Sequence, residues 1–297
     1  MSETLTHSCP AKVNLFLRVL AREASGYHGI ETLFCRIALH DTLEVTRTDT
    51  GITLDVEGAD VGPTEQNLAW RAADAVLAAT GRRFGVAMRL VKRIPAGGGL
   101  GGGSSDAAAA LRAVNQLANG AVPASELLQM ANRLGADVPF FLADAPLALA
   151  WGHGQRLLRL PALPSKPMLL LFPGAAVPTG DAYRWVDEVR DADGPRGTVV
   201  LDQTVLQSWS DLARLGGNDF EGAVFGRFPQ IRAGFEALAG THPFLCRMSG
   251  SGSTLFAVYR TEQDREDAAS RLGGRFGAVV RTQAGSSMID HPERASP

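Results

Sequence analysis

The sequence has few cysteines and no long apolar run. Its 297 residues include three cysteines, Cys9, Cys35 and Cys246, which lie far apart and show no CxxC or Cys/His spacing. This usage disfavours a disulfide framework and a structural zinc site. No apolar run approaches the roughly 20 residues of a membrane span, and the first residues lack a secretory pattern. We therefore expect a cytoplasmic protein with neither export nor a membrane anchor.

An excess of charge of one sign is also missing. The formal net charge is -2, and basic and acidic residues are interleaved along the chain. Nucleic acids and anionic lipids are bound through basic faces, so neither is expected as a partner. A hydrophobic content of 45% with 20% charged residues is typical of a soluble globular enzyme, and small neutral or anionic molecules remain candidate ligands.

Glycine, in contrast, is concentrated in PAGGGLGGGSSDAAAA at residues 95–110, which joins an alternating segment to an alanine-rich one. Bare backbone N–H groups at the start of a helix bind anions, so this loop predicts a polyphosphate site. Gly97, Gly99 and Gly102 also match the G-x-G-x-x-G of dinucleotide folds, but the second strand with its terminal acidic residue is missing. No Gly-Lys-Ser/Thr completes a P-loop.

Periodicity along the chain predicts an α+β protein with two domains. Strands are expected within residues 12–20 and 42–58, and helices over 67–81, 107–118 and 124–135. Prolines within 161–167 indicate a boundary between a domain at 1–160, with the glycine loop, and one at 161–297. The second domain has its own loop, SGSGS at 249–253, between two expected strands. Two such loops suggest a cleft closed around phosphate from both domains.

Polar residues follow the glycines where the helix is expected to begin. Ser104, Ser105 and Asp106 are all residues that cap helix N-termini. We interpret Asp106 as the cap. Ser105 is free to reach a phosphate oxygen or a magnesium ion, as hydroxyls do in other phosphate loops.

Three segments in chain order resemble the three motifs of the GHMP kinases: PAKVN at 10–14, PAGGGLGGGSSDAA at 95–108 and MSGSGSTLF at 248–256. Further segments resemble one subgroup of that family, whose acceptor carries a cytidine diphosphate group: SGYHGIETLF at 25–34, GADVPFFL at 135–142 and NDFE at 218–221. The resemblance covers about residues 9–260. It implies a first domain like the second domain of ribosomal protein S5 and a second domain of ferredoxin-like topology.

The resemblance also implies an activity. It is the transfer of the γ-phosphoryl group of ATP, with Mg2+, to the 2-hydroxyl of 4-diphosphocytidyl-2-C-methyl-D-erythritol, in non-mevalonate isoprenoid synthesis. A mevalonate- or homoserine-type kinase and a nucleotide-binding sensor without turnover are the alternatives. Tyr27, His28 and Tyr183 favour an acceptor with a nucleobase, and the presence of both Lys12 and Asp137 argues against a sensor.

Catalytic roles carry over to two residues. Asp137 matches the general base, although its position after a helix would alone predict an Asx turn. Lys12 matches a lysine that pairs with this base, although a lone strand lysine is otherwise simply solvated. A cation there would keep the carboxylate ionised and stabilise charge at the reacting centre.

Binding roles carry over to the remaining motif residues. For the acceptor they are Asn14, Tyr27, His28, Tyr183 and Gly250, together with Asp137; Tyr27 and Tyr183 would enclose cytosine and His28 would hydrogen bond to its polar edge. For ATP they are Asn67, Leu68, Lys92 and the loop residues Pro95, Ala96, Gly97, Gly98, Gly99, Leu100, Gly101, Gly102, Gly103, Ser104 and Ser105.

Overall fold

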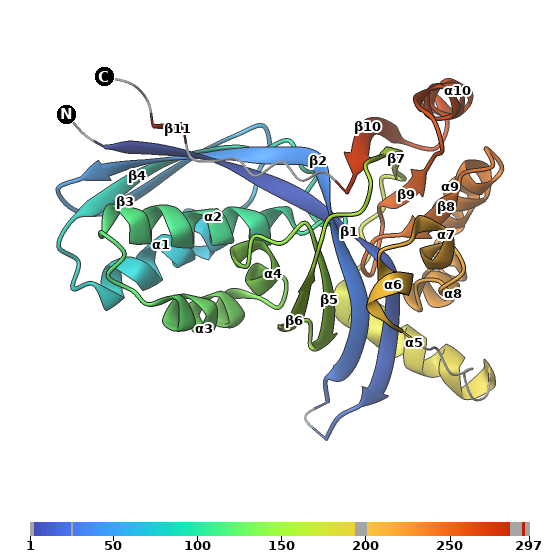
Figure 1. Cartoon of the computed structure of the whole chain (residues 1–297), viewed down its shortest axis with the longest axis horizontal. Coiled ribbons are helices and arrows are strands. Elements are labelled where there is room, and N and C mark those ends of the chain that lie inside the picture. Colours follow the sequence, from blue (N-terminus) through green and yellow to red (C-terminus); the bar gives the residue numbers. More distant parts are fainter. Residues whose placement is uncertain (1–2, 25, 194–200, 286–292, 295–297) are drawn as a thin grey trace.

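The fold is built around two long antiparallel strands, β1 (Thr4–Arg22) and β2 (His28–Thr48), which run through both lobes of the molecule (Figure 1). The computed structural model describes residues 3–24, 26–193, 201–285 and 293–294. The register of β1 against β2 shifts at Pro10/Ala11, Asn14/Leu17 and Val19/Arg22, and such interruptions of the pairing bend a ribbon. The strand expected within residues 12–20 is present, but it has no single buried face: Val13 and Leu15 lie in one core cluster and Leu17, beyond a register shift, lies in another. Lys12 and Asn14 are buried as well.

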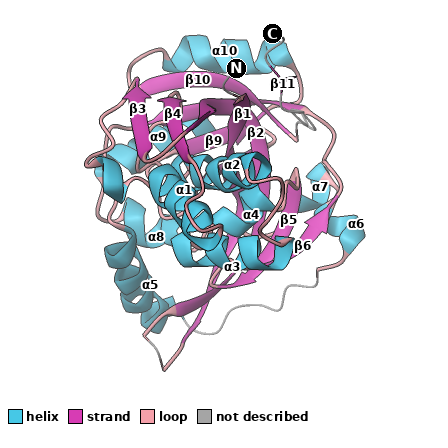
Figure 2. Ribbon diagram, turned by 90° about the vertical axis from the view of Figure 1, so that its left-hand side faces the viewer, coloured by secondary structure: helices cyan, strands magenta, loops and turns pink. Residues whose placement is uncertain are grey.

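The first lobe packs helices against one face of its strands (Figure 2). Its elements are β3 (Ile52–Glu57), η1 (Thr64–Gln66), α1 (Leu68–Ala79), β4 (Gly85–Val91), α2 (Gly102–Leu117), α3 (Ala124–Leu134), α4 (Val138–Leu142), β5 (Leu147–Gly152) and β6 (Arg156–Leu160). β4 lies between β2 and β3, antiparallel to the first and parallel to the second. The turn at 48–51 is therefore not a hairpin between paired strands.

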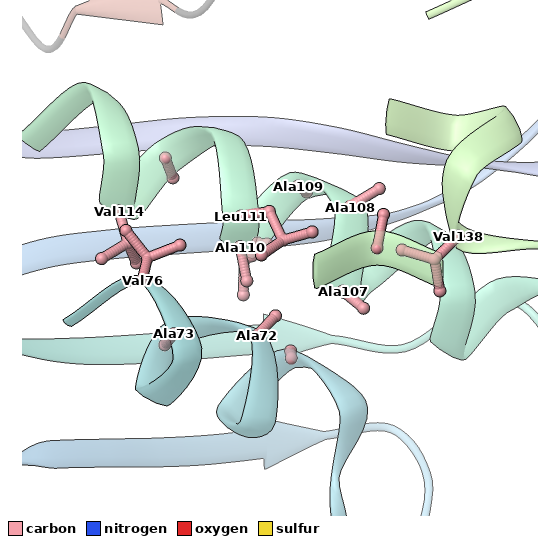
Figure 3. Close-up of a cluster of buried hydrophobic side chains, with 14 of the residues drawn as sticks. Ala72, Ala73, Val76, Ala107, Ala108, Ala109, Ala110, Leu111, Val114 and Val138 are labelled. Atoms are coloured by element: carbon pink, nitrogen blue, oxygen red, sulfur yellow. The ribbon is translucent and has the colours of Figure 1, made fainter. Parts of the chain in front are cut away.

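Small side chains let α1 and α2 approach closely in the core of this lobe (Figure 3). Ala72 and Ala73 of α1 lie against the alanine-rich face of α2, where Ala110 is fully buried. Asn67 caps α1 by accepting a hydrogen bond from the Ala69 N–H at 2.9 Å, and Gly81 has the positive φ of a residue beyond a helix C-terminus. This packing fixes the axis of α2 and hence the place of its N-terminus.

Two helix starts differ from the sequence expectation. α2 begins at Gly102, so Asp106 lies inside the helix and is buried; its interpretation as the cap was wrong. The cap position is occupied by Gly101, which has no side chain to donate or accept. α3 ends at Gly135 as expected, but Pro139 then stands in the first turn of the unpredicted helix α4, where its missing N–H has no intrahelical partner to lose.

The second lobe contains the remaining elements: β7 (Lys166–Phe172), α5 (Thr179–Asp193), α6 (Gln203–Leu206), α7 (Trp209–Leu212), α8 (Phe220–Phe225), α9 (Pro229–Ala239), β8 (Leu245–Met248), β9 (Leu255–Val258), α10 (Glu262–Leu272), β10 (Ala278–Ala284) and β11 (Glu293–Arg294). The strand order β10-β7-β9-β8, with helices after β7 and β9, is the ferredoxin-like arrangement. The α+β class is thus confirmed.

The two lobes share one sheet. Ala284 of β10 pairs with Ile37 of β2, and β11 pairs with β1 near the start of the chain. The β5–β6 hairpin, which the sequence pattern did not predict, pairs β5 with β2 just before the proline cluster. A boundary at residue 160 stays a prediction. Among the described helices, none combines the length and apolar character that crossing a membrane requires.

Candidate active site

The glycine loop between β4 and α2 forms the floor of a cavity of about 400 Å3. Gly97, Gly99 and Gly101 have φ values of +71°, +76° and +73°, which side chains other than glycine rarely adopt. Because no side chain caps α2, the first N–H groups of that helix are open to an anion. The lining comprises Val61, Gln66, Asn67, Leu68, Lys92, residues 94–104 and Asp106.

The SGSGS loop between β8 and β9 packs directly on the glycine loop. The Thr254 N–H donates to the Gly98 carbonyl at 3.3 Å, and Ser249 Oγ donates to the Gly99 carbonyl at 2.9 Å. A Cβ atom on Gly99 would lie 2.2 Å from the Ser249 carbonyl oxygen. The second lobe therefore closes onto the loop of the first, and bare backbone is needed at their contact.

Lys12 lies at the centre of the site. Its Nζ donates to Asn14 Oδ1 at 2.8 Å and to the Gly99 carbonyl at 2.9 Å, and it lies 3.5 Å from Asp137 Oδ2. An ammonium has three protons, and here it faces three acceptors. The Lys12 side chain is 4% exposed, whereas that of Asp137 is 30% exposed. Of the two groups, the carboxylate is therefore the more accessible to a ligand.

The structure excludes two simpler interpretations of these residues. Asp137 makes no capping hydrogen bond to α4, so the Asx turn expected from spacing alone is absent, and Lys12 is not solvated. The proximity of Lys12 and Asp137, which spacing could not provide, results from α2 packing against both β1 and α4.

Asn14 links β1 to the second loop. Its Oδ1 accepts from the Gly250 N–H at 2.9 Å as well as from Lys12, and its Nδ2 donates to Thr32 Oγ1 at 2.8 Å. The amide therefore orients Lys12 and Gly250 from within the protein. A contact of Asn14 or Gly250 with an acceptor stays a prediction.

The NDFE segment holds the second loop from its other side. Asn218 Nδ2 donates to the carbonyls of Met248 and Gly250, at 2.8 and 2.6 Å. Glu221 Oε1 accepts from the Met248 N–H at 2.8 Å, and Asp219 Oδ2 accepts from the Val19 N–H of β1. This motif, to which the sequence assigned no role, ties the loop to the central strand.

A second cavity, of about 730 Å3, brings together the residues expected at a base. Tyr27, which is 67% exposed, the buried His28 and the half-buried Tyr183 all line it. The Tyr183 ring stacks on His28 at 5.2 Å, and the Tyr27 ring is tilted against His153 at 5.4 Å. The sequence assigned no chemistry to His153, which reaches this cavity from the unpredicted turn between β5 and β6. Ser25, which opens the GYH segment, lies outside the described residues.

Asp137 is adjacent to residues that line each of the two cavities. Asp137 directly follows Ala136, which lines the larger cavity. Burial, and next the charge of Asp137, raise the pKa of Tyr183 in the same lining to about 12. On its other side, Lys12 joins Asp137 to Gly99 of the glycine loop. A contact of Asp137 with a ligand stays a prediction.

Lys92 is held by two buried carboxylates beneath the glycine loop. Its Nζ lies 2.5 Å from Asp41 Oδ2 and 2.7 Å from Asp106 Oδ2. Burial lowers the pKa of Lys92, but the ion pairs with Asp106 and Asp41 raise it more, whereas burial raises the pKa of Asp106 to about 7. Asp41 Oδ1 also accepts from the Ile94 N–H at 2.8 Å. Asp41 was not among the predicted site residues, because its sequence context is only that of a carboxylate in an alternating strand.

The structure brings Ser104 to the loop cavity but not Ser105. Ser104 is among the lining residues, whereas Ser105 is 1% exposed and its Oγ has no hydrogen-bond partner among the described residues. Ser105 points into the protein because α2 begins at Gly102, earlier than expected. A magnesium contact for Ser105 stays a prediction that this orientation does not favour.

Comparison with known proteins places this geometry in a family. The model of the GHMP kinases N terminal domain matches residues 67–144, and that of the GHMP kinases C terminal matches residues 201–278. A relative from Chlorobaculum tepidum, named 4-diphosphocytidyl-2-C-methyl-D-erythritol kinase, is 37% identical over 278 residues, 94% of this chain and 96% of its own length. The chain belongs to the GHMP kinases. The resemblance in its motifs is therefore confirmed, and membership in a kinase family implies the use of ATP.

Other relatives of this GHMP kinase agree. A Deinococcus radiodurans protein with the same name is 41% identical over 91% of this chain and 89% of its own length. A crystal structure titled 4-(cytidine 5'-diphospho)-2C-methyl-D-erythritol kinase superposes with a TM-score of 0.81, at 38% identity, over 95% of this chain and 99% of the other. The expected two-domain GHMP kinase fold is confirmed.

Proposed function

We propose that this GHMP kinase transfers the γ-phosphoryl group of ATP to the 2-hydroxyl of 4-diphosphocytidyl-2-C-methyl-D-erythritol. The names of the Chlorobaculum and Deinococcus relatives support this acceptor. The observation that carries the proposal is the place of Lys12, whose one ammonium contacts Gly99 of the phosphate-type loop and the carboxylate of Asp137. A donor phosphate and an acceptor hydroxyl would meet at that point.

The glycine-loop cavity fits ATP. A Cβ atom on Gly97 would meet nothing within 4 Å, so the loop leaves open space where phosphate oxygens would bind to N–H groups at the start of α2. Asn67 and Leu68, at the start of α1, line the same cavity and would border the adenosine. The ammonium of Lys92 is already paired with the carboxylates of Asp41 and Asp106. Lys92 would therefore support the shape of the loop rather than bind phosphate.

Magnesium would neutralise charge on the triphosphate. Among the described residues, no three acidic, histidine or cysteine side chains group together as a metal site. Magnesium commonly keeps several waters and binds substrate phosphates, so the triphosphate would supply most of its ligands. Ser104, not Ser105, is the hydroxyl that lines this cavity.

Asp137 would act as the general base. Its carboxylate would accept the proton of the acceptor hydroxyl as the oxygen attacks phosphorus, a contribution typically of about 10² to 10⁴ in rate. Lys12 would favour the ionised carboxylate and stabilise the charge that develops between donor and acceptor. The base of the acceptor would extend into the larger cavity, with Tyr27 and Tyr183 supplying ring faces.

The test measures ADP release by the purified protein with Mg-ATP. The acceptors 4-diphosphocytidyl-2-C-methyl-D-erythritol, mevalonate, homoserine and galactose are offered separately. Turnover with the cytidyl acceptor alone is expected, and Asp137→Ala should lose at least about 100-fold in kcat while still binding ATP. Asp74→Ala is the matched control, because Asp74 pairs with Arg82 on the surface of α1.

Each other result has a distinct meaning. Turnover with another acceptor would reject the proposed substrate, and no turnover with any acceptor would favour a nucleotide-binding sensor. Activity of Asp137→Ala close to that of the native protein would reject the proposed base.

A further inference from the structure

We propose that Asp187 is a positioning residue that orients His28 to read the base of the acceptor; this inference rests on the function proposed above. Both carboxylate oxygens of Asp187 face His28 Nε2, at 2.8 and 3.0 Å. The His28 side chain is only 5% exposed, whereas that of Asp187 is 34% exposed. The sequence motifs of the family resemblance include His28 but not Asp187.

One helix supplies both partners of the His28 ring. Tyr183 and Asp187 lie four residues apart on α5, and hence on the same face of that helix. Tyr183 stacks on the ring with an interplanar angle of 13°, while Asp187 holds its edge. His28 begins β2, so the contact joins the central strands to the second lobe. All three residues line the larger cavity.

The contact selects one tautomer of His28. An ionised carboxylate can only accept hydrogen bonds, so Nε2 must carry the proton. In the neutral ring this makes Nδ1 an acceptor, and no described residue hydrogen bonds to it. The histidine therefore presents a fixed acceptor atom, rather than a ring free to turn or to exchange its proton between the two nitrogens.

A fixed acceptor distinguishes cytosine from uracil. Cytosine carries an exocyclic amino group, which donates, where uracil carries a carbonyl oxygen, which accepts. Nδ1 would accept a hydrogen bond from the amino group of cytosine. It would not bind the carbonyl oxygen of uracil, because two facing acceptors leave both groups unpaired. Asp187 would thus determine base preference without touching the phosphoryl group.

The experiment compares the native protein with Asp187→Ala, using the cytidyl acceptor and its uridyl analogue. In Asp187→Ala, KM for the cytidyl acceptor should rise by roughly 10-fold to 100-fold, and the preference for cytidyl over uridyl should fall by a similar factor. KM for ATP should stay within about twofold, since only the base end is altered. Asp187→Asn, whose amide oxygen can still accept from Nε2, should recover part of the loss.

Glu188→Ala is the matched control. Glu188 is the next residue of α5, is acidic and pairs with Arg227, yet it does not line the cavity. An unchanged cytidyl KM and base preference in Asp187→Ala would overturn the inference. Equal rises in KM for ATP and for the acceptor would also overturn it, since they would indicate a purely structural role.

Binding separates this inference from the proposed function. Calorimetric titration with cytidine and uridine 5'-diphosphates requires no turnover. Native protein that prefers the cytidine nucleotide, with that preference lost in Asp187→Ala, supports base reading even if the kinase assay fails. Native protein that binds the two equally refutes it. Absence of turnover with the cytidyl acceptor counts against the proposed function alone.

Discussion

Replacing Lys12 with methionine tests the centre of the site with little change in shape. Methionine keeps an unbranched apolar stem of similar length but removes the ammonium. Two of the three acceptors keep another donor, because Gly99 O still accepts from Ser249 Oγ at 2.9 Å and Asn14 Oδ1 from the Gly250 N–H at 2.9 Å. Since neither group is left unpaired, the variant should lose only about 1 to 3 kcal/mol of unfolding free energy.

Catalysis should suffer far more than folding. Lys12→Met leaves the Asp137 carboxylate without the cation 3.5 Å away, and removes positive charge from the point where donor and acceptor would meet. Loss of one preorganised electrostatic group typically lowers kcat by about 10² to 10³. KM for ATP should change little, because Lys12 does not line the glycine-loop cavity.

The assay follows ADP release at saturating ATP and cytidyl acceptor, alongside chemical denaturation of the same preparation. Lys166→Met serves as the control, because Lys166 stands at the start of β7, outside both cavities. A folded Lys12→Met protein that keeps more than about a tenth of native kcat would refute the catalytic role. Failure of the variant to fold would instead show that its three contacts are chiefly structural.

Three further predictions concern stability, pH and binding. Gly99→Ala should destabilise the protein by about 3 kcal/mol in denaturant titrations, through left-handed φ and a clash with Ser249, whereas Gly97→Ala, with open space, should lose only about 1 kcal/mol. Burial lowers the pKa of His7 from 6.5 to about 4, so the unfolded chain binds the proton first. Stability should therefore be complete above about pH 6.5 and decline by about 3 kcal/mol toward pH 4; His7→Leu should lack this component, and an unchanged slope would exclude His7 as its source. Tyr27→Ala should raise KM for the acceptor far more than for ATP, since this exposed ring lines only the larger cavity, and equal rises would argue against stacking.

Local features of the site could be predicted because their cause is local. A run of glycines before an alanine-rich segment needs left-handed backbone and an open helix start, and both are present at Gly97 to Gly102. The hairpin around SGSGS likewise follows from two short apolar strands with turn residues between them. The start of α2 was misplaced because glycines disfavour helix interiors, yet packing against α1 and β1 extends the helix through Gly102 and Gly103.

By itself, the sequence determined the α+β class, the loop at a helix mouth, the GHMP kinase motifs and the residues from which a site could be built. Only the tertiary structure decided which of these residues meet. Lys12 and Asp137 are 3.5 Å apart because α2 packs against both β1 and α4, and Asp106 pairs with Lys92 because α2 begins early. His28 meets Asp187 because α5 packs against the start of β2. Such contacts join residues distant in the chain, and their partners depend on packing across the whole molecule rather than on neighbouring residues.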